Sequence, residues 1–245
     1  NNRRKLSLTR QIEMAKFYQA SVIVPVFNEQ ERIGPFLKKL EKEVKNGWEI
    51  IFVDDGSKDK TADLIKKSGI KNLRIISYDI NKGKGYAVKK GVEASTGKLV
   101  IFIDADDSIH PSQIDKMVRS LKEHDFVAGD RSAKESDVQQ PLFRKFFGFC
   151  FNTYSNALFG LSINDKLCGF KGFRSSIAKK LFSNLKSNRW IFDIEIFFKA
   201  KKHGIKLHQI PINWIYKDKS KMKPLDLLKM IFELIILRMR LMRPK

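Results

Sequence analysis

Cysteines, long apolar runs and acidic residues are all scarce in this sequence. Its 245 residues include two cysteines, Cys150 and Cys168, which form neither a disulfide framework nor a metal-binding spacing. This favours a reducing, cytosol-facing location over secretion. No stretch approaches the ~20 consecutive apolar residues of a membrane span. There is also no internal repeat and no Gly-x-x-x-x-Gly-Lys-Ser/Thr spacing, which argues against a repeat protein and a P-loop nucleotidase.

The shortage of acidic residues leaves the chain strongly basic. There are 48 lysines and arginines against 27 acidic residues, a formal net charge of +21. Such a field attracts polyanions, which include nucleic acid, an anionic membrane surface and phosphorylated substrates. Because no recognised nucleic-acid-binding motif appears, we predict no nucleic-acid partner. The 42% hydrophobic share favours a folded chain over a disordered one.

Short apolar runs alternate with helix-like segments in the first half of the chain. This pattern is typical of a mainly parallel sheet covered by helices, and it predicts an α/β fold. The predicted strands are Ser21–Val26, Ile50–Val53, Leu73–Ser77, Leu99–Ile103 and Phe126–Ala128. The predicted helices are Glu29–Lys45, Lys60–Lys67, Lys84–Ala94 and Pro111–Leu121.

The regular alternation of short strands and helices does not continue in the second half, which begins with a polar loop over Asp130–Gln140. Strands are predicted near Gly169–Arg174 and Leu207–Tyr216, and helices over Leu142–Leu161, Ile191–Lys202 and Pro224–Met242. The helix over Leu142–Leu161 is rich in aromatic residues at helical spacing. It is either an in-plane helix at a membrane interface or a core helix under a loop. The last helix is amphipathic and carries interspersed basic residues.

The strongest chemical signal is the segment Asp104-Ala105-Asp106. It follows the apolar run Leu99–Ile103, so both carboxylates stand at a strand end and point to the same side of an extended backbone. Two such carboxylates make a hard oxygen site for Mg²⁺ or Mn²⁺ that keeps positions open for diphosphate oxygens. A solvated acidic turn is the alternative interpretation.

Two more clusters follow the first two predicted strands. Their members are Pro25, Phe27, Asn28 and Glu29 after the first strand, and Asp54 and Asp55 after the second. Phe27 could stack on a base, and Asn28 or Glu29 could hydrogen-bond to a ribose or a base edge. Asp54 and Asp55 are candidates for base, ribose or metal contacts. The alternative in both places is a plain turn that caps the next helix.

The fourth cluster is Asn81-Lys82-Gly83-Lys84-Gly85. Its glycines allow the backbone to approach a ligand closely, a helix N-terminus follows, and Lys82 and Lys84 add positive charge. A basic turn is the alternative. Because open α/β sheets bind ligands at the carboxyl ends of their strands, we expect all four clusters to meet at one edge.

In this order and spacing, the four clusters resemble the nucleotide-binding half of family-2 glycosyltransferases with the A-type fold, over Ser21–Arg131. The resemblance implies a Rossmann-like sheet and a nucleotide-sugar site, with Mg²⁺ or Mn²⁺ held by Asp104 and Asp106. The residues expected at the nucleotide-sugar are Pro25, Phe27, Asn28, Glu29, Asp54, Asp55, Lys82, Gly83, Lys84, Asp104, Ala105 and Asp106.

Motifs in the second half extend the resemblance to Pro224. They are Gly129–Ser132, Asp165–Lys171, Arg189–Glu195 and Ile212–Trp214, and the set is similar to the dolichyl-phosphate β-glucosyltransferase group. The resemblance implies inverting transfer of glucose from UDP-glucose to dolichyl or polyprenyl phosphate. Alternatives are another donor such as GDP-mannose, a saccharide or protein hydroxyl as acceptor, or a non-catalytic basic binding protein.

A phosphate acceptor is mostly ionised at pH 7, so it needs positioning by cations more than a general base. We therefore expect acceptor contacts from Arg131, Arg144 and Lys171, with Arg131 counted as catalytic beside Asp104 and Asp106. Arg131 could instead pair with Asp130 or Asp104. Trp190, Asp193 and Glu195 are also expected near the acceptor or the sugar. The two acids could act as a base, bind sugar hydroxyls, or only orient Trp190 and Arg189.

The domain boundaries follow from these assignments. We predict a basic lead-in over residues 1–18 and a catalytic domain over 19–216, which divides into a nucleotide-sugar half (19–131) and an acceptor half (132–216). A basic amphipathic membrane-associating helix occupies 217–245. We expect a membrane-associated enzyme whose active site faces the cytoplasm, at the endoplasmic reticulum in a eukaryote or the plasma membrane in a prokaryote. A membrane-protein partner or a homo-oligomer would explain the same surfaces.

Overall fold

The computed structural model describes residues 18–139, 142–217 and 224–242. Within these ranges, the side chains at 139, 142–145, 147 and 224–228 lie outside the description. The predicted basic lead-in over 1–18 therefore lies almost wholly outside the described residues.

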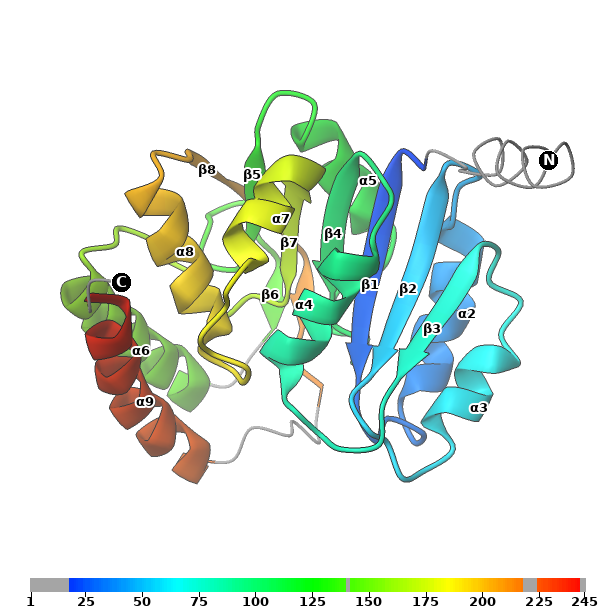
Figure 1. Ribbon diagram of the computed structural model, residues 1–245, viewed down its shortest axis with the longest axis horizontal. Coiled ribbons are helices and arrows are strands. Elements are labelled where there is room, and N and C mark those ends of the chain that lie inside the picture. Colours follow the sequence, from blue (N-terminus) through cyan, green and yellow to red (C-terminus); the bar gives the residue numbers. More distant parts are fainter. Residues whose placement is uncertain (1–17, 140–141, 218–223, 243–245) are drawn as a thin grey trace, which may run out of the picture.

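A seven-stranded sheet runs through the centre of the described chain (Figure 1). Its strands are β1 (Ala20–Val26), β2 (Trp48–Asp54), β3 (Leu73–Ser77), β4 (Leu99–Ile103), β5 (Phe126–Asp130), β7 (Phe170–Arg174) and β8 (Leu207–Pro211). The spatial order is β3-β2-β1-β4-β7-β5-β8, and every pair is parallel except the two that involve β7. The predicted mainly parallel sheet is confirmed, whereas the sequence pattern does not reveal the reversed strand.

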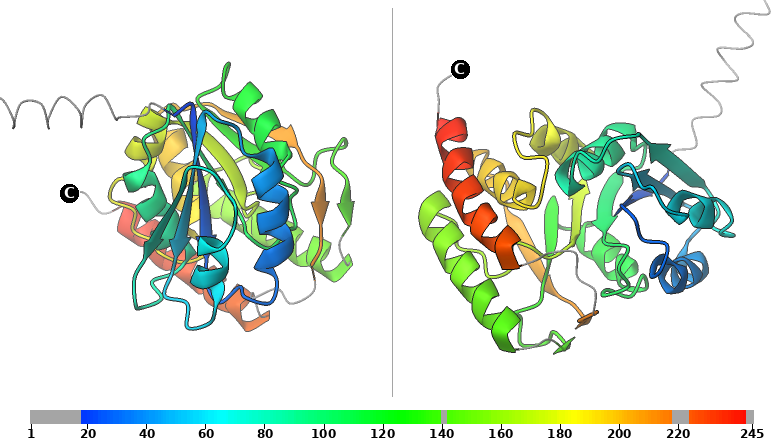
Figure 2. Two further views of the ribbon diagram at one scale, coloured as in Figure 1. Left: turned by 90° about the vertical axis from the view of Figure 1, so that its right-hand side faces the viewer. Right: turned by 90° about the horizontal axis from the view of Figure 1, so that it is seen from below.

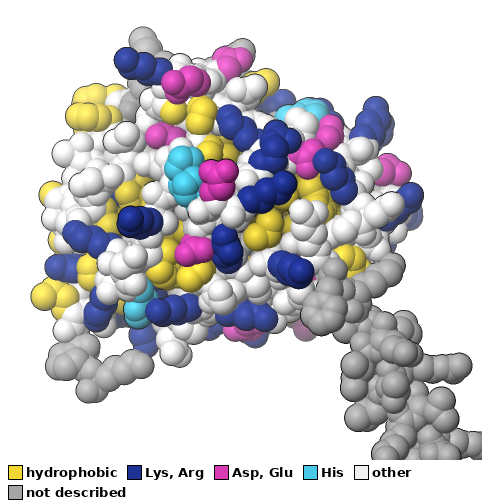
Figure 3. Space-filling view, turned by 90° about the horizontal axis from the view of Figure 1, so that it is seen from above, with side chains coloured by type: hydrophobic (Ala, Val, Ile, Leu, Met, Phe, Trp, Pro, Cys, Tyr) yellow, Lys and Arg dark blue, Asp and Glu magenta, His cyan; other side chains and the backbone are white. Residues whose placement is uncertain are grey.

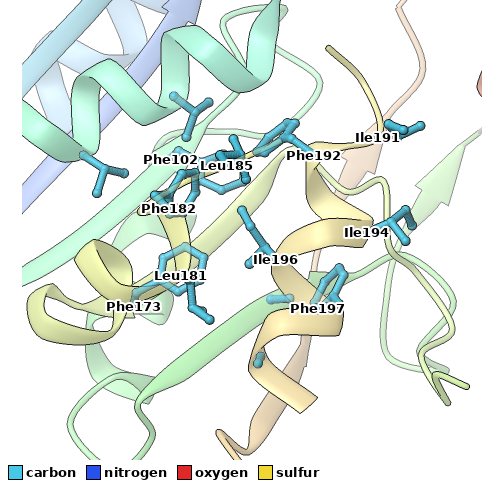
Figure 4. Packing of buried hydrophobic residues seen from close by; sticks show 14 of the residues in the cluster. Phe102, Phe173, Leu181, Phe182, Leu185, Ile191, Phe192, Ile194, Ile196 and Phe197 are labelled. Carbon is cyan, nitrogen blue, oxygen red and sulfur yellow. The ribbon is translucent and has the colours of Figure 1, made fainter. Parts of the chain in front are cut away.

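Helices cover both faces of the sheet. One face is covered by α2 (Ile33–Glu43), α3 (Thr61–Lys66) and α5 (Gln113–Ser120), and the other by α4 (Lys84–Ala94), α7 (Ser175–Phe182) and α8 (Phe192–Lys202). Alternate strand residues feed the two cores, so Phe102 of β4 faces α8 while its neighbours Ile101 and Ile103 face the opposite layer. The ring of Phe102 lies 5.9 Å from that of Phe192, centroid to centroid (Figure 4).

Two longer helices, α6 (Leu142–Phe159) and α9 (Pro224–Met242), lie side by side next to α8 (Figure 2). The inner face of α9 buries Met230, Leu234 and Leu237. Its outer face is also apolar, with Phe232 66% and Met239 54% exposed. Among the described residues, no helix is both long and apolar enough to cross a bilayer.

Some predicted elements differ from the observed ones. The helix predicted from Glu29 begins at Ile33, with Pro35 in the first turn, where a missing N–H is harmless. The predicted strand Leu207–Tyr216 is two strands, because β8 ends at Pro211 and β9 (Trp214–Ile215) pairs with β6 (Val138–Gln139) in a separate sheet. Helix α7 is absent from the predictions.

The carboxyl ends of the parallel strands lie together at the lower edge of the sheet in Figure 1, which we call the carboxyl edge. Because β7 is reversed, it enters the sheet at this edge with Phe170. The opposite side of the molecule carries lysine and arginine side chains spread among fewer acidic ones (Figure 3). The positive charge is therefore not confined to the carboxyl edge.

Candidate functional site

The four predicted clusters come together at the carboxyl edge. Strands β2 and β4 flank β1 in the sheet, so the residues that follow these three strands are spatial neighbours. The backbone N–H of Asn28 donates to Ser57 Oγ at 2.8 Å, and the N–H of Lys58 donates to Asn28 Oδ1 at 2.8 Å. These reciprocal bonds join the turns after β1 and β2 into one surface.

The turn after β1 is fixed by its polar residues. Asn28 adopts a left-handed conformation (φ 48°), which asparagine tolerates better than most residues. The carboxylate of Glu29 pairs with Arg32, with Arg32 Nη2 2.9 Å from Glu29 Oε1. Pro25 and Phe27 are half-buried at the same edge. Arg32, not Asn28, occupies the residue before α2, so Asn28 is not the cap of that helix.

Asp55 organises the glycine-containing loop. Its buried carboxylate accepts hydrogen bonds from the backbone N–H groups of Lys82 and Gly83 at 2.8 Å each, and from Asn81 Nδ2 at 2.8 Å. Gly83 has a φ of 101°, and a Cβ there would lie 2.5 Å from the carbonyl oxygen of Asn188. Asp55 therefore sets the position of the loop from which Lys84 extends. Asp54 accepts from the N–H of Ser57 at 2.9 Å.

Lys84 and Asp104 form the central ion pair of the site. Lys84 Nζ lies 2.6 Å from Asp104 Oδ1 and 2.9 Å from Oδ2. Burial lowers the pKa of Lys84, but Asp104, Asp193 and Asp106 more than offset this effect and hold that pKa above its ordinary value. Gly169 packs directly against Asp104, because a Cβ on Gly169 would lie 1.8 Å from Asp104 Oδ2. The carboxylate is thus held on one side by a permanent positive charge and on the other by a glycine.

Asp106 is the second outward carboxylate, with Ala105 buried between it and Asp104. Burial and the nearby Asp104 raise the pKa of Asp106, while hydrogen bonds from Ser108 and the charge of Lys84 oppose that rise. Within the described residues no third His, Cys, Asp or Glu completes a metal-binding group. Two partly exposed carboxylates fit Mg²⁺ or Mn²⁺, which is bound through one or two carboxylates with the remaining ligands from water and phosphate oxygens.

Asp107, the third acid in the run, faces another way. It adopts a left-handed conformation (φ 61°) and accepts from Lys39 Nζ at 2.7 Å, and Lys217 Nζ lies 3.5 Å from the same carboxylate oxygen. These two ammonium groups compensate its charge. The structure therefore separates Asp107 from the Asp104 and Asp106 pair.

Arg131 is bound to Asp165. Its Nε and Nη2 donate to the two Asp165 oxygens at 2.7 Å and 2.8 Å, and its backbone N–H donates to Asp165 Oδ2 at 3.0 Å. The guanidinium also lies 5.3 Å from the ring centroid of Trp214. Arg131 holds the pKa of the Asp165 carboxyl below its usual value, although burial opposes this. The partner is therefore neither Asp130 nor Asp104, the two alternatives considered from the sequence.

Lys171 is completely buried, and this contradicts the expectation that it contacts an acceptor. Its ammonium lies 2.8 Å from Asp193 Oδ1 and donates to the carbonyl oxygens of Lys166 and Cys168 at 3.1 Å and 2.6 Å. Burial raises the pKa of Asp193, and Lys171 opposes that rise. This pair ties the start of β7 to the first turn of α8.

Glu195 also has an internal role, so the expected sugar or acceptor contact is wrong for this side chain. It is fully buried, accepts from the backbone N–H groups of Lys186 and Ser187 at 2.9 Å and 2.8 Å, and pairs with Lys199 Nζ at 2.9 Å. It thereby fixes the loop that carries Trp190. Among the roles considered from the sequence, this arrangement agrees with the one in which the acid only orients Trp190 and Arg189.

Trp190 is half-buried at the carboxyl edge, and Lys84 Nζ lies 5.7 Å from its ring centroid. This leaves Trp190 in place for the predicted contact with sugar or acceptor. Arg144 belongs to α6, but its side chain lies outside the described residues, so the prediction for it stays open.

Comparison with known proteins identifies the family. The model for "Glycosyl transferase family 2" matches residues 21–182. The chain belongs to glycosyl transferase family 2. It is therefore a glycosyltransferase. The mainly parallel sheet seen in the structure is the A-type fold expected of this family.

Curated relatives match most of the chain. The dolichyl-phosphate beta-glucosyltransferase of Dictyostelium discoideum is 35% identical over 83% of this chain and 68% of its own. The human protein of that name is 32% identical over 91% of this chain and 75% of its own. An uncharacterized protein of Methanocaldococcus jannaschii is 35% identical over 88% of this chain and 90% of its own.

Solved structures share the fold. Glucosyl-3-phosphoglycerate synthase from Mycobacterium tuberculosis in complex with Mg²⁺ and UDP has a TM-score of 0.69 and 20% identity, over 93% of this chain and 82% of its own. The same enzyme with Mn²⁺, UDP-glucose and phosphoglyceric acid also gives 0.69, at 19% identity over 90% of this chain and 79% of its own. At this identity the likeness concerns the fold.

Sequence reasoning missed two charged residues of the site. Asp165 belongs to one of the predicted motifs but has no predicted role, although it binds Arg131. Arg32 was not singled out, yet its pKa is raised by its hydrogen bond with Glu29 and also by the fields of Asp106 and Asp104. The three-residue spacing from Glu29 was the available signal, because residues at this spacing meet within one helical turn.

Proposed function

We propose that the protein transfers glucose from UDP-glucose to dolichyl or another polyprenyl phosphate, with inversion, to give a β-linked lipid-phosphate sugar. The observation that carries this proposal is the match to proteins named dolichyl-phosphate beta-glucosyltransferase over 83% and 91% of this chain. The geometry of the carboxyl edge supports it, because outward carboxylates, a charged lysine and an aromatic ring converge there.

The donor would bind across the turns that follow β1, β2 and β4. Asp104 and Asp106 would hold Mg²⁺ or Mn²⁺, which when bound supplies positive charge opposite the diphosphate. Lys84 stays protonated near neutral pH because its pKa is raised, so it adds a fixed positive charge beside the same carboxylates. Charge that opposes the departing diphosphate lowers the barrier to its departure.

In the reaction, an oxygen of the acceptor phosphate attacks the anomeric carbon of glucose. A new carbon–oxygen bond forms on one face as the bond to UDP breaks on the other, and UDP leaves with that electron pair. The acceptor is already mostly ionised at neutral pH, since its second pKa is about 6. No side chain has to remove a proton, so the protein's contribution is positioning and charge stabilisation.

The burial of Asp193 and Glu195 favours a phosphate acceptor over a hydroxyl. A hydroxyl acceptor would need a general base within reach. Asp193 is 2% exposed and ion-paired with Lys171, while Glu195 is 0% exposed and bound to backbone N–H groups. Neither is available to an incoming hydroxyl in this arrangement.

We also propose that α6 and α9 dock on the membrane that holds the acceptor. Large apolar side chains stand out from this pair, with Phe149 68% and Phe232 66% exposed. On α9 the exposed Phe232, Ile235, Met239 and Met242 recur at helical spacing, so they form one stripe. An apolar stripe with exposed Lys229 and Arg240 at its borders is suited to the interface of an anionic membrane.

The test is a transfer assay with purified full-length chain, a short polyprenyl phosphate, Mg²⁺ or Mn²⁺, and labelled UDP-glucose, with GDP-mannose and other nucleotide-sugars in parallel. We expect label in the organic phase from UDP-glucose alone. Asp106→Asn should lower the rate about a hundredfold or more. Asp107→Asn, a neighbouring carboxylate paired with Lys39, is the matched control and should keep measurable transfer. Absence of organic label with every donor would overturn the proposal.

A further inference from the structure

A second candidate binding site lies away from the carboxyl edge. An open cavity of about 650 Å³ is formed where the C-terminal ends of α6, α8 and α9 meet. Lys202 on its wall is the last residue of α8, whereas Asp193 of the carboxyl edge lies in the first turn of that helix. They are nine positions apart on the helix, about 13 Å along its axis.

The wall of the cavity combines cations with apolar groups, and none of the described residues that line it carries a carboxylate. Its charged side chains are Arg238, Lys201 and Lys202. Lys201 donates to the carbonyl oxygen of Gly160 and so neutralises the end of α6. Lys202 is exposed and points its charge to solvent. The pKa of the adjacent His203 is lowered by burial and then by Lys180, Lys202 and Lys199, which agrees with a positive local potential.

The guanidinium of Arg238 is held by aromatic rings, and its N–H groups are left available as hydrogen-bond donors. Its guanidinium carbon lies 5.1 Å from the ring centroid of Phe198 and 5.8 Å from that of Phe159. Among the described residues, no hydrogen bond or ion pair engages this half-buried group. Contacts with aromatic faces hold a guanidinium by its plane and leave the N–H groups on its rim free to bind an anion. Planar, bidentate donation is the geometry that phosphate accepts best.

The apolar stripe of α9 leads into this cavity. Met242 belongs to both, since it lines the cavity and is 63% exposed. We propose that the cavity binds the phosphate headgroup of an anionic membrane phospholipid, with its acyl chains along the stripe. This inference rests on the proposed membrane docking of α6 and α9. It assigns a lipid site separate from the acceptor site, which would select anionic bilayers and orient the protein on them.

The experiment measures binding of the full-length chain to vesicles of phosphatidylcholine, with and without phosphatidylglycerol. Arg238→Gln should weaken binding to phosphatidylglycerol vesicles about tenfold or more. The matched control is Arg240→Gln, which removes the same charge from an exposed position of α9 that does not line the cavity. It should weaken binding about threefold or less, and that effect should disappear at high salt. Lys202→Gln, at an exposed lining residue whose replacement leaves the fold intact, should show a several-fold loss.

The remaining outcomes also decide the question. Equal losses for Arg238→Gln and Arg240→Gln, or no preference for phosphatidylglycerol, would overturn the proposal in favour of diffuse attraction. Competition by inorganic phosphate with no vesicle effect of Arg238→Gln would assign the cavity to a soluble phosphate and also overturn it. The assay contains neither sugar donor nor acceptor. Failure of the proposed sugar transfer would therefore appear separately, as a wild-type chain that binds anionic vesicles through Arg238 and transfers no sugar.

Discussion

The acidic side chains near the carboxyl edge divide into two groups by their burial. Asp55, Asp165 and Glu195 are buried and accept hydrogen bonds from backbone N–H groups, so each holds a loop in place. Asp104 and Asp106 are only partly buried and face the edge. Burial without hydrogen bonds would be costly for a carboxylate, which explains why the first group is so fully paired. The second group is left with the capacity to bind a ligand.

Gly169 gives a direct test of how closely Asp104 must be placed. In Gly169→Ala the new Cβ would lie 1.8 Å from Asp104 Oδ2, so the carboxylate must move. A displacement of about 1 Å at a reacting site can cost about a hundredfold in rate, and we expect a loss of this order in the transfer assay. The control is Gly34→Ala in α2, where no atom lies within 4 Å of the added Cβ. Equal activity of the two variants would contradict the positioning role.

Lys166 should make stability depend on alkaline pH. It is fully buried, its ammonium donates to oxygens of Asn152 and Ile163, and burial lowers its pKa to about 8 from 10.5. Between these two pH values the unfolded chain keeps a proton that the folded chain has lost. The free energy of unfolding should therefore rise with pH across this window, by at most ~1.4 kcal/mol per pH unit.

Denaturant titrations of the wild type and Lys166→Met at several pH values would measure this effect. The difference in unfolding free energy between them cancels the titration of other groups. It should grow in favour of the wild type from pH 8 to pH 10.5, the interval set by the two pKa values. A difference that stays constant over this interval would show that Lys166 remains protonated in the folded state.

The sequence was informative about which residues gather at the edge and less so about which of them face outward. The strand-end positions of Asn28, Asp55 and Asp104 were enough to predict their proximity, since parallel strands end at one edge. Lys171 was misassigned because its strand is reversed and buried on both faces, and neither property is visible in a five-residue stretch. Pairing partners such as Asp165 depend on long-range contacts that local patterns do not encode.

At the scale of elements, the loop between α7 and α8 links the two halves of the site. The backbone carbonyl oxygen of Asn188 in this loop accepts a hydrogen bond from the N–H of Tyr86 at 3.0 Å and lies against Gly83. Phe192, the first residue of α8, lies against Gly85. Glu195 fixes the start of the loop from within α8. The position of Trp190 relative to Lys84 thus depends on a carboxylate that is itself fully buried.

We expect Glu195→Gln to destabilise the protein without abolishing transfer. The glutamine amide can replace one acceptor oxygen but leaves buried N–H groups of Lys186 or Ser187 and the Lys199 ammonium less well paired, at a cost of about 1–3 kcal/mol. Thermal unfolding should report this loss. Glu93→Gln, which removes exposed pairs with Lys89 and Lys90 on α4, should change the free energy of unfolding by no more than about 0.5 kcal/mol. Complete inactivity of folded Glu195→Gln would instead support a catalytic base and a hydroxyl acceptor.

The bounds of some elements were predicted accurately. Strands Leu73–Ser77 and Leu99–Ile103 and the helices Lys84–Ala94 and Pro224–Met242 have the predicted bounds. Helix α7 was missed because Ser175 follows Arg174 of β7 directly, with no glycine or proline to mark the change of period. Where no glycine or proline marks a boundary, tertiary packing determines where an element begins, and packing cannot be derived from a local sequence pattern.

At the scale of the whole molecule, charge and apolar surface make separable contributions to membrane binding. Lysine and arginine side chains are spread over the face shown in Figure 3, whereas the apolar stripe belongs to α9. Attraction by dispersed surface charge is screened over about 8 Å at physiological ionic strength, but insertion of apolar side chains is not.

Vesicle binding at increasing salt should therefore fall to a plateau. We expect the plateau to be lost in the double variant Phe232→Ser and Met239→Ser, since burial of each of these side chains contributes about 1.5–3 kcal/mol at most. The low-salt part of the curve should persist in this variant because its charge is unchanged. Salt-independent binding that survives both substitutions would place the membrane contact elsewhere on the protein.

The reversed strand β7 has a consequence for recombination among members of this family. It lies between β4 and β5, which both precede residue 131, although β7 itself belongs to the part of the chain that follows. The Phe173 ring of β7 stacks at 4.5 Å on Phe126 of β5 and faces Phe102 of β4 at 6.4 Å. A chimera that exchanges only the first 131 residues for those of a relative would therefore cut through the sheet at its middle. A chimera designed to change sugar specificity would therefore have to exchange β7 as well, as a second segment.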